Sequence, residues 1–130
     1  MGMYTKYSVS LNIVSIMGNE ERELALKEKL EELKLEFKKS RTGRSYVIDS
    51  LCVIGGHNGC LNIYGHGEIK NYDGDIEDMC RFLMVNFPSS EGILYIQYEE
   101  DENPTIHLFS HCRHARLDPN FRFVGYGNNC

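Results

Sequence analysis

Three histidines and one cysteine lie within eight residues in the segment "HLFSHCRHARLDP", which runs from His107 to Pro119. Imidazole and thiolate groups are the ligands that zinc prefers, and a Cys beside a His is also the pairing used in thiol catalysis. In a β-strand, however, alternate side chains point to opposite faces. His107 and His111 would then face one way, and Cys112 and His114 the other. The segment therefore predicts an ordinary strand, and we expect no metal and no cofactor.

A small metal- or thiol-dependent enzyme is the alternative hypothesis. The site of such an enzyme would combine two groups of residues. His57 and Cys60 lie across a predicted turn from each other, and the others are His107, His111 and His114. One Cys with one nearby His is weak evidence for a nucleophile, and the chain has neither a GxxxxGK nor a GxGxxG phosphate-binding motif. The five cysteines are scattered without a CxxC pair, which favours buried thiols over a disulfide framework. We therefore expect a protein that is not an enzyme.

The charge of the chain is concentrated in one segment. The net charge is −5, but ten acidic and two basic residues between Glu68 and Glu102 give that segment alone −8. Because phosphate binding needs clustered Lys and Arg, this balance argues against a nucleic-acid partner. It suits a basic protein partner, although a solvated acidic surface is the plainer alternative.

The elements that would position these groups follow from the periodicity of the apolar residues. Tyr7 to Ile13 alternates apolar and polar residues, which predicts a half-buried strand. Apolar residues at helical spacing predict a helix between Asn19 and Gly43, and a second helix that begins at Asp73 or Asp75 and ends before Pro88. The segments "RSYVIDSLCVIGG", "CLNIYG", "EGILYIQYEED" and "TIHLFSHCRHA" predict four further strands. We expect a loop after Gly65 and an irregular tail, "RLDPNFRFVGYGNNC".

This order predicts an α+β fold: a mostly antiparallel sheet of about five strands with two helices packed on one face. The length of 130 residues suits a single domain, 1–130. No apolar run is long enough to span a bilayer, and no secretory signal is recognisable. We therefore expect a soluble, cytoplasmic, monomeric protein that binds neither membranes nor nucleic acid.

The second half of the chain resembles the Immunity protein 7 family of bacterial polymorphic-toxin systems. The resemblance lies in "CLNIYGHG", in the strand entry at Ser90 and Gly92–Tyr95, in the acidic turn Glu99–Glu102, and in the ending at Asp118, Pro119 and Phe121. It covers Cys60 to Phe121. After His66 the sequence departs from the family pattern with "GEIKNYDG".

The resemblance implies an immunity protein that binds and neutralises a cognate toxin domain. Many such toxins are nucleases with basic surfaces, which the acidic segment would complement. The expected partner-contacting residues are acidic or aromatic: His66, Tyr72, Asp73, Asp75, Glu77, Tyr98, Glu99, Glu100, Asp101 and Glu102. A structural subunit or adaptor with another partner is a third hypothesis.

Overall fold

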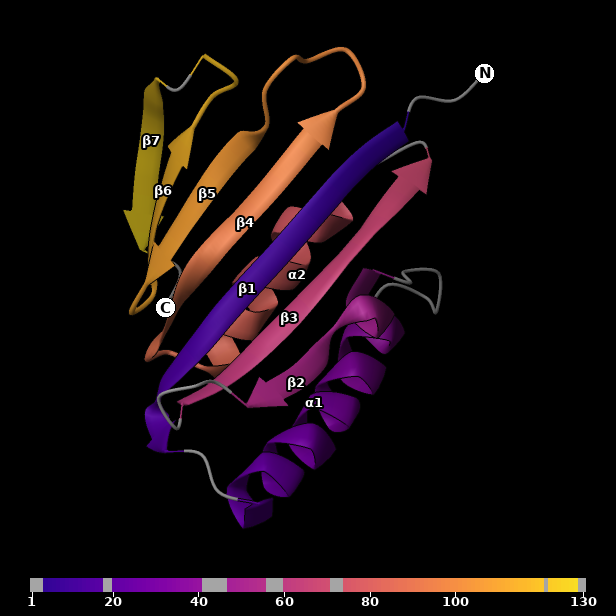
Figure 1. Ribbon diagram of the computed structural model, residues 1–130, viewed down its shortest axis with the longest axis vertical. Helices are drawn as coiled ribbons and strands as arrows, with labels where there is room; N and C mark the ends of the chain where they lie inside the picture. The colour runs from indigo at the N-terminus through magenta and orange to yellow at the C-terminus, as the bar shows by residue number, and fades with distance from the viewer. Residues whose placement is uncertain are drawn as a thin grey trace.

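The structure is a computed structural model that describes residues 4–17, 20–40, 47–55, 60–70, 74–120 and 122–128. Its elements are β1 (Tyr4–Met17), α1 (Glu20–Ser40), a 3₁₀ turn η1 (Val47–Ser50), β2 (Cys52–Gly55), β3 (Cys60–Lys70), α2 (Asp75–Asn86), β4 (Ser90–Tyr98), β5 (Thr105–Ser110), β6 (Arg113–Leu117) and β7 (Phe123–Asn128). The strands form one antiparallel sheet in the order β2-β3-β1-β4-β5-β6-β7 (Figure 1). The central strand is therefore β4, as its apolar run predicts.

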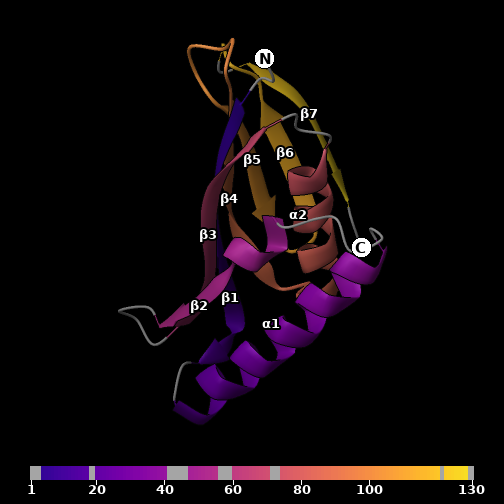
Figure 2. The ribbon, with the colours of Figure 1, turned by 90° about the vertical axis from the view of Figure 1, so that its right-hand side faces the viewer.

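Both helices cover the same side of the sheet (Figure 2), so the predicted α+β architecture is confirmed. The core lies between the two layers. Leu11, Leu94 and Ile63, from three neighbouring strands, are fully buried there against Leu30 of α1 and Leu83 of α2. Burial of these side chains is the main source of stability, because each contributes on the order of 2 kcal/mol.

The sheet has seven strands rather than about five, for two reasons. The segment predicted as one return strand breaks at His111 and Cys112, whose φ angles of 50° and 69° lie in the left-handed region. The chain reverses there and forms the tight hairpin of β5 and β6. The segment predicted as an irregular tail supplies the rest of β6 and the edge strand β7.

The first part of the loop predicted after Gly65 belongs instead to β3, which continues to Lys70, and residues 71–73 lie outside the described residues. Only glycine fits at position 65 of this strand, because a Cβ there would come within 2.8 Å of the Ser50 hydroxyl and of a Leu51 methyl group. The glycine therefore allows η1 to approach the sheet closely. The prediction failed because glycine in a strand can mark a close approach rather than a turn.

The two helices begin and end near their predicted limits. The Glu-rich start and Lys-rich end of α1 match the helix dipole, while the predicted flanking residues Asn19 and Gly43 lie outside the described residues. Asp75 is the first residue of α2 rather than its cap; the cap position belongs to Gly74, at φ 98°. Among the described residues, neither helix has the length and apolar character needed to cross a membrane.

Candidate functional site

Carboxylates from three elements meet at one end of the sheet. β3 and β4 both pair with β1, so the end of β3 and the end of β4 flank the start of β1. The first turn of α2 and the turn between β4 and β5 lie at the same end. We call this region the acidic end; its carboxylates are Glu68, Asp75, Glu77, Asp78, Glu99, Glu100, Asp101 and Glu102.

A hydrogen bond joins α2 to the end of β4 within the acidic end. The Tyr98 hydroxyl donates to Glu77 Oε1 over 3.4 Å. Burial raises the pKa of Glu77, partly offset by hydrogen bonds and by Arg81. Burial and the nearby Glu77 carboxylate raise the pKa of Tyr98 to about 12, so the phenol stays protonated as the donor. The contact fixes the position of the acidic turn relative to α2.

The turn after β4 is held by its own polar groups. The Asp101 amide donates to the Tyr98 carbonyl over 3.0 Å, and the Gln97 side-chain amide donates to the Asp101 carbonyl. The Tyr4 amide at the start of β1 donates to Glu99 Oε2 over 3.1 Å. The carboxylates of this turn are therefore presented from an ordered backbone rather than from a loose loop.

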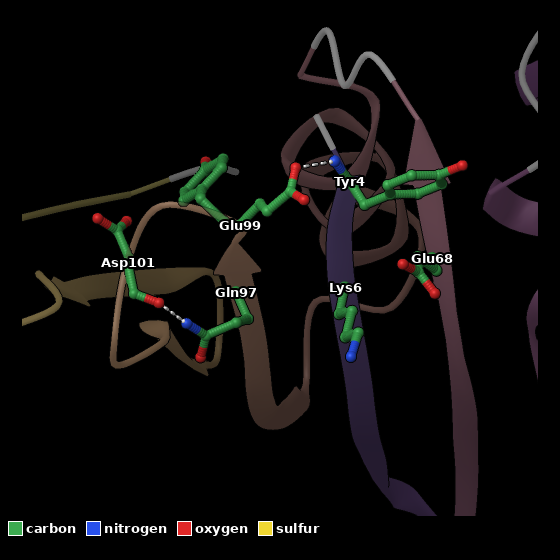
Figure 3. A pocket seen from close by; sticks show the side chains of 7 residues that line it. Tyr4, Lys6, Glu68, Gln97, Glu99 and Asp101 are labelled. Atoms are coloured by element: carbon green, nitrogen blue, oxygen red, sulfur yellow. Dashed lines mark hydrogen bonds between the residues drawn. The ribbon is translucent and has the colours of Figure 1, made fainter. Parts of the chain in front are cut away.

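A pocket of about 260 Å³ opens at the acidic end, on the side of β1 between β3 and β4 (Figure 3). Lys6 lies between Glu68 on β3 and Gln97 on β4, with which it is paired in the sheet register. Three carboxylates and one ammonium line the pocket, so its formal charge is −2. The lining residues are Tyr4, Lys6, Glu68, Gln97, Tyr98, Glu99 and Asp101.

The structure gathers most of the predicted contact residues that it describes. The turn from Tyr98 to Glu102 lies with Glu77 and Asp75 at the acidic end. His66 is exposed on β3, one row away from Glu68 on the same face of the sheet, and its ring lies 5.8 Å from that of Tyr64. Tyr72 and Asp73 lie outside the described residues. The Tyr98 hydroxyl already donates a hydrogen bond to Glu77, so it is less available to a partner than the sequence predicts.

Sequence reasoning missed Glu68, Lys6 and Tyr4 as parts of this site. Glu68 belongs to the predicted acidic segment, but the glycines before it predict a loop there. The register of β3 on β1 brings it beside Lys6, more than sixty positions away in the sequence, and Glu99 lines the same pocket. The only available signal was the alternation of polar residues along β1, which continues to Lys6.

The histidines of the opening segment are arranged differently from the prediction. Because the chain reverses at residues 111–112, His107 and His114 share the helix-covered face, and His111 lies in the turn. His107 Nδ1 and His114 Nε2 are 2.8 Å apart, and both rings stack with Phe109. Burial, His114, Arg116 and Arg81 lower the pKa of His107 from 6.5 to about 4. Burial and the two arginines also lower the pKa of His114, so both rings are neutral near pH 7 and pack beside the core residue Phe109.

Within the described ranges, no three His, Cys, Asp or Glu side chains form a group that could hold a metal. His57 and the side chain of Cys60 lie outside them. Burial raises the pKa of the Cys80 thiol, which disfavours the reactive thiolate. Cys52 is exposed, and Cys112 is disulfide-bonded. The expectation of buried thiols therefore holds for Cys80 and is wrong for the other two.

Comparison of the chain with protein-family models, with curated proteins and with solved structures finds no match.

Proposed function

We propose that this chain is an immunity protein that binds the toxin domain of a bacterial polymorphic-toxin system, a basic nuclease, and covers its active site or substrate surface. The observation that carries the proposal is that carboxylates of β3 and of the β4–β5 turn line one pocket, while α2 places Glu77 at the same end of the sheet. Nucleases hold phosphates with clustered Lys and Arg, and the acidic end offers such a surface the opposite charge.

The pocket suits a basic side chain of the partner. Glu68, Glu99 and Asp101 line it and make it net negative, and a guanidinium group binds carboxylates through paired hydrogen bonds. Because the turn is held by Gln97 and by the Tyr4 amide, little further ordering is needed on binding. An ordered surface loses less free energy on association than a flexible one.

The resemblance of Cys60 to Phe121 to the Immunity protein 7 family supports the same function. The metal- or thiol-dependent enzyme gains no supporting geometry from the residues that the structure describes, so we propose no second function.

The test begins with the gene beside the one that encodes this chain. If it encodes a toxin-type nuclease, the purified nuclease domain should lose its RNA-cleaving activity at a one-to-one ratio with this protein. Co-expression should also restore growth to cells that produce the toxin. Full cleavage in the presence of excess protein, or the lack of any toxin-type gene beside it, would remove the proposal.

Charge-neutralised variants test the role of the acidic end. The variant changes the four turn residues Glu99, Glu100, Asp101 and Glu102 to Gln or Asn. Its matched control changes four exposed α1 residues, Glu21, Glu28, Glu32 and Glu36, to Gln and so carries the same net charge. The turn variant should associate on the order of 10–100-fold more slowly at low salt, since charge steers encounter. Equal slowing in the control would show that only net charge matters.

A further inference from the structure

The side of the sheet that faces away from α1 and α2, which we call the open face, changes in character across the strands. On β1 it carries Lys6, Ser8, Ser10 and Asn12, the polar alternation usual for a sheet with one wet face. On β4, β5 and β6 it carries apolar residues instead. We call these the apolar patch: Ile93, Tyr95, Ile106, Leu108, Ala115 and Leu117.

The strand register makes this patch continuous. Ile106 pairs with Tyr95 on one side and Leu117 on the other, and Leu108 pairs in the same way with Ile93 and Ala115. Tyr95 and Leu108 are the most exposed members, at 42% and 41%. Neither described helix lies over this side (Figure 2). Clustered exposed apolar residues of this kind mark interaction surfaces, whereas isolated ones do not.

The surroundings of the patch indicate the charge of its occupant. Along β4 the open face continues from Tyr95 to Gln97 and then into the acidic turn at Glu99. The far end of the same strand carries Glu91, with Arg113 two strands away. The rim nearest the exposed tyrosine is therefore net acidic, with three carboxylates against the one ammonium group of Lys6, which favours a partner whose apolar contact area is bordered by Lys and Arg.

We propose that the apolar patch is the central contact surface for the basic toxin domain, and that the acidic end forms the rim of that contact. This inference rests on the proposed function and makes it more specific. A second copy of this chain fits the patch less well. It carries the same acidic rim and a net charge of −5, so pairing would bring like charges together.

The two parts of the surface have separate effects on binding. Apolar and aromatic side chains at the centre of an interface hold most of the binding free energy and control dissociation. Charges at the rim act on the rate of encounter and on its salt dependence. Tyr95 and Leu108 therefore set the lifetime of the complex, and the turn carboxylates set its rate of formation.

The experiment measures binding kinetics with the nuclease domain encoded beside this chain's gene, used in a catalytically inactive form as the probe. Tyr95→Ala and Leu108→Lys should each accelerate dissociation by about 30-fold or more with little change in the association rate. Leu35→Lys on α1 and Val85→Lys on α2 are the matched controls, since these side chains are 61% and 57% exposed on the helical layer. They should leave both rates unchanged.

Each outcome decides the inference. Wild-type dissociation rates in both patch variants, with slower association in the turn variant, would overturn it and leave the proposed function standing. A wild-type dimer in light scattering that dissociates in the patch variants would also overturn it, in favour of a second copy as the occupant. If the wild-type protein does not bind the probe at all, the proposed function fails and the inference fails with it. Urea unfolding of each variant separates lost contacts from lost folding.

Discussion

The two faces of the sheet use the same kinds of residue for different purposes. On the covered face, Leu94 and Ile96 of β4 are fully buried under the helices; on the open face, their neighbours Ile93 and Tyr95 lie at the surface. The covered side chains obtain their stability from the chain's own helices. The open ones are less buried and gain less from folding, which is why we propose that they contact another molecule. This difference between the faces is what separates the stability of the protein from its proposed function.

The largest expected effect compares two leucines on neighbouring strands. Leu94→Ala on the covered face should lower the free energy of unfolding by about 2–5 kcal/mol, because it leaves a cavity in a closely packed core. Leu108→Ala on the open face should change it by less than about 0.5 kcal/mol. Urea unfolding measures both. Equal losses would show that the open face is as important for stability as the covered one.

The next largest expected effect is a pH dependence of the free energy of unfolding, and it arises from a histidine on the covered face. Burial, His114 and the two arginines hold the pKa of His107 near 4, against 6.5 in the unfolded chain. The unfolded chain therefore binds a proton between these pH values that the folded chain does not. The free energy of unfolding should fall as the pH drops through this window, by up to about 3 kcal/mol from this group.

His107→Phe tests this expectation, because Phe can keep the stacking on Phe109 but cannot titrate. Unfolding should be measured at several pH values between 4 and 7. The variant should lose stability less steeply than the wild type as the pH falls. His66→Gln, at an exposed position on the open face, is the control. A slope that is unchanged in His107→Phe would contradict the buried, neutral state of this pair.

The smallest expected effect is the difference in stability loss between substitutions of two tyrosines, one on each face. Tyr7 is buried on the covered face and donates to the Ser50 hydroxyl over 2.8 Å, so Tyr7→Phe should cost about 1 kcal/mol of stability. Tyr95→Phe on the open face should cost almost none, since water replaces a partner there. Thermal unfolding measures both changes. A larger loss at Tyr95 than at Tyr7 would reverse the proposed roles of the two faces.

The sequence predicts the layers of this fold better than the site. Alternation along β1 and helical spacing in α1 and α2 are local signals, so the α+β class and the shared face of the helices follow from them. The reversal at His111 and Cys112 could not be predicted, because the segment has none of the Gly, Asn or Asp residues that usually mark a tight hairpin turn. Because of this reversal, His107 and His114 lie on the same face of the sheet rather than on opposite faces as predicted.

The site depends on strand pairing, which a local pattern does not specify. The turn acids were found from charge alone, but Glu68 and Lys6 join them only through the register of β3 on β1. The apolar patch also had a signal in the sequence, but this signal predicted burial rather than an exposed surface. The run of apolar residues in β4 predicts burial on both faces, and the described structure covers only one.

Side-chain footprinting of the complex tests the central claim most directly. Hydroxyl radicals should oxidise Tyr95, Leu108, Leu35 and Val85 in the free protein, because all four are exposed. Binding of the inactive nuclease domain encoded beside this chain's gene should protect Tyr95 and Leu108 strongly and leave Leu35 and Val85 unprotected. Protection of the helical pair, with Tyr95 and Leu108 oxidised as in the free protein, would contradict the account.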